Sequence, residues 1–140
     1  MIKAAITFQL NELESAVSFL LSHLTFGDVV AVTGEMGAGK TTVIKALLIA
    51  LQSQDHVSSP TFSIVNTYQV KNGLVHHFDL YRLKSFQELL DLGFDIYLEE
   101  GALVLIEWPE LATPLMPDHM IRLQIEINND QSRTITLAQA

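Results

Sequence analysis

Residues 34–41 carry the spacing Gly-x-x-x-x-Gly-Lys-Thr, and no other stretch of this sequence restricts the possible folds as strongly. In such a segment the glycines let the backbone turn its N–H groups toward an anion, and a helix that starts inside the segment adds partial positive charge. The flanks meet this requirement, because residues 28–33 form an apolar, β-branched run and residues 41–51 are largely apolar and helix-forming. The sequence therefore predicts a buried strand, a phosphate-binding loop and a helix in succession.

Two side chains of this loop have expected roles in binding a nucleotide. Lys40 can reach the β- and γ-phosphates, and the hydroxyl of Thr41 can ligate Mg²⁺. The alternative is a glycine-rich turn that only caps a helix, but such a turn does not require a lysine at the helix start. We therefore expect a nucleotide with Mg²⁺. The residues expected to contact the nucleotide here are Glu35, Met36, Gly37, Ala38, Gly39, Lys40, Thr41 and Thr42.

The rest of the chain predicts an α/β fold in a single domain over residues 1–140. Of the 140 residues 49% are hydrophobic, which is enough for a core, and none is a cysteine, which excludes disulfides and thiolate metal sites. Helices and strands alternate in the first half and strands dominate the second. This order predicts a three-layer P-loop NTPase-type fold, with a mostly parallel central sheet and antiparallel hairpin additions. Strands are expected over residues 2–8, 28–33, 61–70, 74–79, 102–106, 120–127 and 133–138, and helices over 12–24, 41–51 and 86–93.

Local signals set several of these boundaries. Asn11 is the expected N-cap of the first helix, with Glu14 as its reciprocal partner. Lys71-Asn72-Gly73 predicts a hairpin turn, and Ser85 predicts the start of a helix. Three prolines predict a loop after the strand over 102–106: Pro109, Pro114 and Pro117.

Two acidic residues stand at strand ends, where a phosphate loop needs a carboxylate to support Mg²⁺. Asp79 ends one expected strand, and Glu107 follows the apolar run 102–106. Because the carboxyl ends of parallel strands meet at one edge of a sheet, both acids reach the nucleotide if their strands run parallel to residues 28–33. The alternatives are a cap or turn role for Asp79 and a solvent-exposed strand end for Glu107.

Four segments together resemble the bacterial TsaE (YjeE) family of ATPases, which takes part in tRNA threonylcarbamoyladenosine biosynthesis. The resemblance covers most of the chain, from the first expected helix to Glu110. The sequences SPTF and HFDLYR beside a phosphate loop are far more specific than the loop alone. The four segments are GEMGAGKTT (34–42), SSPTFSIVNTY (58–68), HHFDLYRL (76–83) and LIEWPE (105–110).

This resemblance implies a catalytic set of Lys40, Asp79 and Glu107. Lys40 resembles the family's phosphate-binding lysine, and Thr41 resembles its Mg²⁺-ligating hydroxyl, with Thr42 beside it. Asp79 resembles the essential Mg²⁺-supporting aspartate. Glu107 is a third candidate metal ligand and the candidate to position the attacking water.

The resemblance also implies a switch and partners. Thr61 lies in a segment that resembles a mobile loop sensing the γ-phosphate, and Trp108 lies near the nucleotide. The family's ATPase acts with TsaD and TsaB, which attach a threonylcarbamoyl group to the adenosine beside the anticodon of certain tRNAs. ATP and Mg²⁺ are the implied cofactors, and the isolated ATPase is expected to be weak because its partners gate it.

The charge of the chain agrees with an indirect role toward tRNA. The net charge is −8, and no Lys or Arg lies between Lys84 and Arg122. Affinity for nucleic acid comes largely from basic side chains, so we expect contact with tRNA only through a basic partner. No apolar run is long enough to span a membrane. The absence of cysteine fits a reducing compartment, so a cytoplasmic location is expected. The oligomeric state is left open.

Other functions are alternatives at this point. A small P-loop phosphotransferase that acts on a metabolite needs basic residues for its acceptor, and the chain has only three arginines, Arg82, Arg122 and Arg133. Arg82 is equally interpreted as an internal arginine finger or as a surface ion pair. A GTPase is disfavoured because no Asn-Lys-x-Asp motif occurs. The sequence does not distinguish a nucleotide sensor without turnover from a slow ATPase. A zinc site at His76-His77 is disfavoured because strand alternation sends the two rings to opposite faces.

Overall fold

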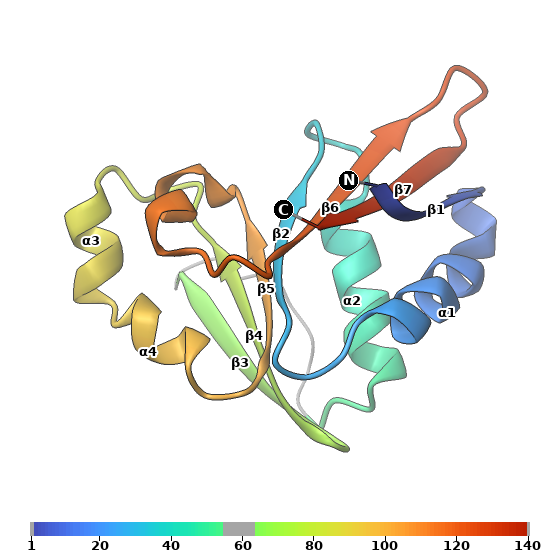
Figure 1. Cartoon of the computed structure of the whole chain (residues 1–140). Coiled ribbons are helices and arrows are strands. Elements are labelled where there is room, and N and C mark those ends of the chain that lie inside the picture. The colour runs from blue at the N-terminus through green and yellow to red at the C-terminus, as the bar shows by residue number, and fades with distance from the viewer. Residues whose placement is uncertain (1, 55–63, 140) are drawn as a thin grey trace.

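A seven-stranded sheet forms the centre of the computed structural model, which describes residues 2–54 and 64–139 (Figure 1). The strands lie in the order β1-β7-β6-β2-β5-β4-β3. Their bounds are β1 (Ile2–Phe8), β2 (Val29–Thr33), β3 (Val65–Val70), β4 (Gly73–Asp79), β5 (Leu103–Glu107), β6 (Ile121–Ile127) and β7 (Arg133–Gln139).

The centre of this sheet is parallel and its margins are antiparallel. Strand β2 pairs in parallel with β5 on one side and β6 on the other, and β4 pairs in parallel with β5. The hairpins β3–β4 and β6–β7 and the pair β1–β7 are antiparallel. The apolar strands β2 and β5 lie in the middle of the sheet, where both faces of a strand are covered. The predicted α/β fold, with a mostly parallel centre and antiparallel additions, is therefore confirmed.

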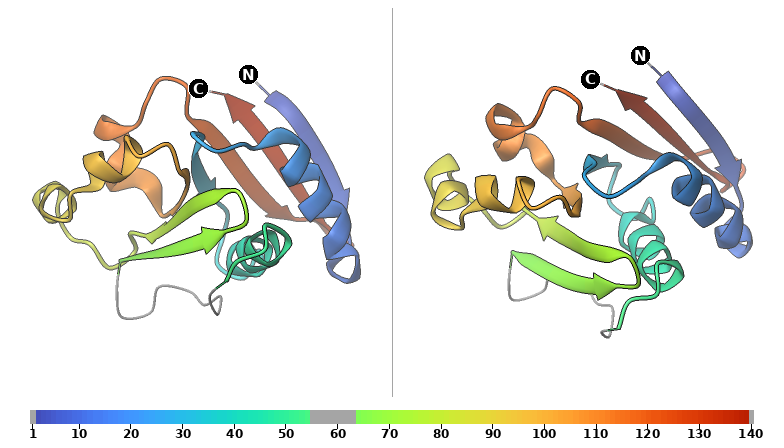
Figure 2. Two further views of the ribbon diagram at one scale, coloured as in Figure 1. Left: turned by 90° about the horizontal axis from the view of Figure 1, so that it is seen from below. Right: turned by 60° about the horizontal axis from the view of Figure 1, so that its bottom comes forward.

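Helices cover both faces of the sheet (Figure 2). Helices α1 and α2 pack together on one face, while α3, α4 and the 3₁₀ helix η2 lie on the other. Alternate residues of β5 contribute to the two hydrophobic cores. Leu103 and Leu105 face the α1–α2 core, and Val104 and Ile106 face the opposite core. The helical bounds are η1 (Leu10–Glu12), α1 (Leu13–His23), α2 (Lys40–Ala50), α3 (Phe86–Asp91), α4 (Phe94–Leu98) and η2 (Pro109–Leu115).

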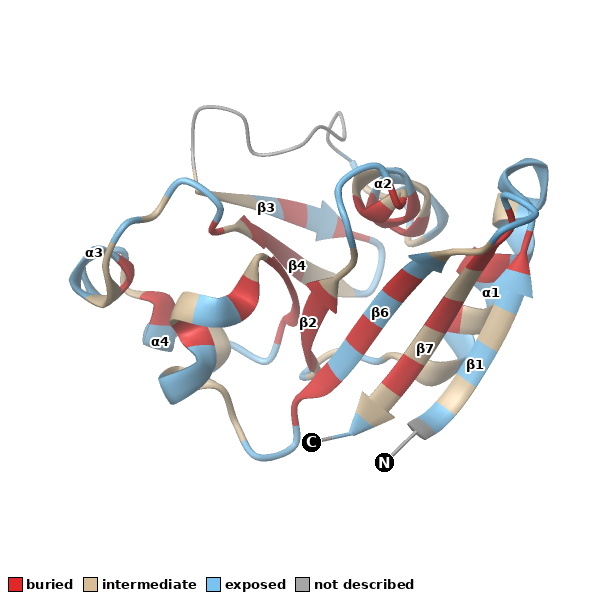
Figure 3. Ribbon diagram, turned by 90° about the horizontal axis from the view of Figure 1, so that it is seen from above, coloured by how far each residue is buried: buried red, intermediate tan, exposed pale blue. Residues whose placement is uncertain are grey.

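The terminal hairpin β6–β7 buries one side and exposes the other. Along β6 buried and exposed residues alternate from Ile121 to Glu126, and along β7 buried residues alternate with partly buried ones (Figure 3). Strand β1 completes this side of the sheet by pairing with β7, so the two ends of the described chain lie side by side. The hairpin runs directly beside β2, which leads into the phosphate loop.

Two local predictions were wrong, and one short helix was not predicted. Glu12, rather than Glu14, reaches back to the backbone N–H of Gln9 at 3.1 Å, because a 3₁₀ turn precedes α1. The expected loop after β5 contains η2, with Pro109 in the first turn, where a proline is tolerated. Helix α4 was not predicted, because so short a helix depends on tertiary packing, here of its buried Phe94 with Tyr97 and Leu98 beside it.

The expected strand over 61–70 begins at Val65 in the described residues, and its positions 61–63 lie outside them. Ser85 caps α3 as predicted, because its Oγ accepts the N–H of Glu88 at 3.2 Å. Within residues 2–54 and 64–139, the helices are too short or too polar for any of them to cross a membrane.

Candidate active site

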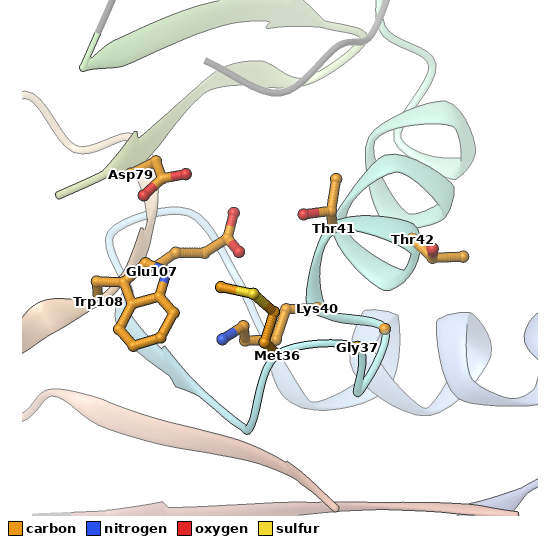
Figure 4. Close-up of a pocket in the computed structure, with 9 residues that line it drawn as sticks. Met36, Gly37, Lys40, Thr41, Thr42, Asp79, Glu107 and Trp108 are labelled. Carbon is orange, nitrogen blue, oxygen red and sulfur yellow. The ribbon is translucent and has the colours of Figure 1, made fainter. Parts of the chain in front are cut away.

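A pocket of about 330 Å³ opens where the phosphate loop meets the carboxyl ends of β4 and β5 (Figure 4). One wall comes from the loop and the first turn of α2, and the other comes from the strand ends and the residue after β5. The lining residues are Met36, Gly37, Gly39, Lys40, Thr41, Thr42, Asp79, Glu107 and Trp108. Residues separated by about half the chain, from Met36 to Trp108, thus share one site.

The shape of the loop depends on two glycines. A Cβ at Gly34 would lie 2.7 Å from the carbonyl oxygen of Ile125, so any side chain there would push the loop away from β6. Gly39 has φ of +101° and is the N-cap of α2, a left-handed conformation that L side chains rarely adopt. The loop consequently turns sharply into α2 and directs the N-terminus of this helix at the pocket.

Lys40 is a buried cation at the floor of this pocket. Its side chain is 8% exposed, and its Nζ donates to the carbonyl oxygen of Gly34 at 2.6 Å. The same Nζ lies 4.3 Å from the centroid of the Trp108 ring. Among the described residues no carboxylate forms an ion pair with it. A buried ammonium held only by a carbonyl and an aromatic face has unused capacity to bind an anion.

Asp79 and Glu107 stand side by side at the opposite wall. They are register partners across the parallel pair β4–β5, and Glu107 is also the register partner of Val32 on β2. Strand alternation places both acids on the face of the sheet that α2 covers, as it does Val75 and Leu105 earlier in the same strands. The expectation that both acids reach the same edge as the phosphate loop is confirmed.

Glu107 is buried and paired with a histidine. Its carboxylate is 3% exposed, and its Oε2 lies 2.7 Å from Nε2 of His77. Within the described part of the chain, Nδ1 of His77 has no hydrogen-bond partner. His76 points to the other face, where it contacts Glu100 at 3.0 Å and Thr67 at 2.8 Å. Sequence reasoning placed the two rings on opposite faces but did not find the partner of His77, because β4–β5 pairing brings Glu107 to it.

The donor atoms around the pocket fit Mg²⁺ and phosphate. Two carboxylates and the hydroxyl of Thr41 are hard oxygen donors, which Mg²⁺ prefers. In Figure 4 the Thr41 hydroxyl faces the carboxylate of Glu107, whereas Thr42 projects from the other side of the same turn. Asp79 is partly buried and accepts the N–H of Tyr81 at 3.1 Å, which leaves carboxylate oxygen capacity for a cation.

The pocket does not include every predicted residue. Glu35 is exposed and does not line it, and Ala38 is buried behind the loop. Thr61 lies outside the described residues. Sequence reasoning also missed Arg133, whose Nε donates to the carbonyl oxygen of Ala38 at 3.1 Å across 95 residues of chain. No local signal marks that contact.

Known proteins are similar to this chain over most of its length. The family model described as "Threonylcarbamoyl adenosine biosynthesis protein TsaE" matches residues 7–135. A Rickettsia felis protein named "tRNA threonylcarbamoyladenosine biosynthesis protein TsaE" is 33% identical over 128 residues, covering 91% of this chain and 74% of that protein. The Haemophilus influenzae protein of the same name is 34% identical, covering 84% and 74%. The crystal structure of Bacillus subtilis YdiB superposes with a TM-score of 0.72 at 25% identity, covering 99% of this chain and 87% of YdiB.

Proposed function

This chain belongs to the TsaE family, and from that premise we propose that it is a Mg²⁺-dependent ATPase that supports threonylcarbamoyladenosine formation in tRNA by acting on a TsaD–TsaB complex. The observation that carries the ATPase assignment is the pocket itself. Lys40 and Thr41 from the loop face Asp79 and Glu107 from two parallel strand ends across one opening. The role in tRNA modification rests on the named relatives.

The loop half of the pocket binds the phosphates. Backbone N–H groups of the glycine-rich turn and the N-terminus of α2 offer hydrogen bonds to phosphate oxygens. Lys40 exchanges the carbonyl of Gly34 and the face of Trp108 for phosphate oxygens. Because the turn and the start of α2 are already formed before the nucleotide arrives, Lys40 is the group of this half that exchanges its partners on binding.

The acid half of the pocket supports turnover. Thr41, Asp79 and Glu107 would hold Mg²⁺, which when bound neutralises charge on the phosphoryl group being transferred. Glu107 is the candidate to orient the attacking water, because its other carboxylate oxygen is available while His77 engages Oε2. His77 thereby keeps the buried carboxylate in one orientation.

The charge distribution supports an indirect relation to tRNA. With a net charge of −8, the chain is a poor binder of phosphate backbones on its own. TsaD and TsaB are therefore the proposed partners, and tRNA contacts belong to them. A cytoplasmic location, where such a complex modifies tRNA, is part of the same proposal.

The decisive experiment is a reconstituted modification assay with TsaD, TsaB, tRNA and the threonylcarbamoyl donor, with and without this chain. We expect repeated cycles of modification only when the chain and Mg·ATP are both present, and none with Lys40→Ala. ATP hydrolysis should rise when TsaD and TsaB are added. Modification that proceeds equally without the chain, or phosphate that appears on an added metabolite instead of in solution, would overturn the proposal.

A further inference from the structure

Arg133 is a buried cation outside the pocket. It is the first residue of β7, it is 8% exposed, and it pairs through the sheet with Phe8 of β1 and Ile127 of β6. A guanidinium is costly to bury unless its donors are used. It donates to two backbone carbonyls: Nε to the carbonyl oxygen of Ala38 at 3.1 Å and Nη1 to the carbonyl oxygen of Gln131 at 2.5 Å. Within the described residues it forms no ion pair with a carboxylate.

The terminal hairpin touches the phosphate loop at both of its ends. At the start of the loop, Gly34 lies so close to the carbonyl of Ile125 that a Cβ would approach within 2.7 Å. Toward the end of the loop, the carbonyl of Ala38 is held by Arg133. Strand β6 pairs with β2, so the hairpin lies next to the strand that leads into the loop. The two contacts clamp the loop against the sheet.

The Arg133 contact also fixes the direction of a peptide group. A trans peptide is planar, so its carbonyl and the following N–H point in opposite directions. The carbonyl of Ala38 points toward Arg133, and the N–H of Gly39 in the same peptide therefore points away from it. Gly39 lines the pocket. A charged donor on the carbonyl further polarises the peptide and strengthens its N–H as a donor.

From these contacts we propose that Arg133 is a positioning residue for the phosphate loop, which sets the Gly39 N–H toward the phosphate chain of the nucleotide without touching it. This assigns a role to the terminal hairpin and rests on the proposed binding of ATP. The loop adopts its binding shape before the nucleotide arrives, so loss of Arg133 weakens binding more than it slows turnover at saturation.

The test uses the full chain with Arg133→Met, Arg133→Lys and the control Arg122→Met. Arg122 is an exposed residue of β6, so its replacement removes the same charge from the same hairpin. Calorimetric titration with Mg·ATP and Mg·ADP should show a Kd raised about 10-fold or more by Arg133→Met, since a charge-assisted hydrogen bond is lost. We expect partial recovery in Arg133→Lys and less than about 2-fold change in Arg122→Met, as for an exposed charge.

A spectroscopic measurement separates positioning from general stability. In the nucleotide-free chain, the amide resonance of Gly39 should shift in Arg133→Met and stay unchanged in Arg122→Met. Turnover at saturating ATP should stay within about 3-fold of the parent chain, because the loop regains its shape when occupied. If Arg133→Met does not fold, Arg133→Gln takes its place in every measurement.

Unchanged Kd values together with an unmoved Gly39 resonance in a folded variant would overturn the positioning role. Equal weakening by Arg122→Met would also overturn it, since long-range charge would then explain the effect. If the parent chain itself bound no Mg·ATP, the proposed function would fail, while the Gly39 resonance would still decide whether Arg133 orients the loop.

Discussion

The two walls of the pocket are built in different ways. The loop wall is contiguous in the sequence, and several of its residues, including Met36 and Gly37, are exposed. The acid wall is assembled from two strands whose acids are 28 residues apart, and Glu107 there is buried and paired with His77. The loop wall is therefore a preorganised binding surface, whereas the positions of the acids on the other wall depend on the register of β4 and β5. We expect the first to control nucleotide affinity and the second to control turnover.

Replacing Lys40 gives the largest expected effect. Lys40→Ala removes the only ammonium that lines the described pocket, so we expect nucleotide affinity to fall at least about 100-fold, by roughly 3 kcal/mol. Calorimetric titration with Mg·ATP checks this, with Lys45→Ala on the exposed side of α2 as a matched control. A variant that bound normally but failed only in turnover would break the division between the two walls.

Replacing Asp79 tests the acid wall. Asp79→Asn keeps the size of the side chain and removes its charge, so we expect turnover to fall about 100-fold while affinity for ADP changes little, because support of Mg²⁺ is lost. Steady-state hydrolysis in the presence of TsaD and TsaB, over a Mg²⁺ titration, measures the loss. Asp95→Asn, an exposed acid of α4, should behave like the parent. Normal Mg²⁺ dependence in Asp79→Asn would argue against its role as a ligand.

The adjacent residues His76 and His77 allow a matched comparison, in which replacement of His77 has the third-largest expected effect. Both rings are buried and each contacts a carboxylate, but Glu107 is in the pocket and Glu100 is 41% exposed on the far face. His77→Leu leaves Glu107 without its partner, so we expect turnover to fall about 10-fold and stability to fall about 1–3 kcal/mol.

The control for that prediction is His76→Leu, which should leave turnover within about 2-fold because Glu100 can turn toward water. Urea denaturation and steady-state hydrolysis, measured on the same preparations, separate the two quantities. Equal losses of turnover in both variants would show that the effect follows stability alone, and His77 would then have no special relation to Glu107.

The smallest expected effect concerns Trp108. Its ring lies between Lys40, at 4.3 Å, and Tyr81, whose ring centroid is 5.0 Å away. Trp108→Phe preserves an aromatic face, so we expect affinity for Mg·ATP to change less than about 3-fold. Because Trp108 is the only tryptophan in the chain, its fluorescence should change when Mg·ATP draws Lys40 away from the ring. A tryptophan emission spectrum that does not change at saturating Mg·ATP would show that Lys40 stays on the ring.

Local sequence was enough for much of the fold. The phosphate loop, the buried strands β2 and β5 and the Asn-Gly hairpin all follow from residues adjacent in the chain, where periodicity and turn chemistry act. It was not enough for α4 or η2. These short elements are held by buried side chains such as Phe94 and Ala112, which local propensity does not reveal.

What the sequence by itself determined is the loop wall and the kind of residues on the acid wall. The spacing of glycines, Lys40 and Thr41 requires a phosphate-binding turn at a helix start, because backbone conformation there depends on neighbours in the chain. The positions of Asp79 and Glu107 at strand ends were also visible, and parallel pairing then brought them together.

Only the tertiary structure decided which groups hold these residues in place. The contact of His77 with Glu107 spans 30 residues, and that of Arg133 with Ala38 spans 95. Each contact forms because strand pairing and strand order bring distant parts of the backbone together. A single histidine or arginine in a sequence does not indicate which residue it will contact. The reactive residues of the pocket are thus recognisable from local sequence, whereas the contacts that hold them in position come from the pairing of the sheet.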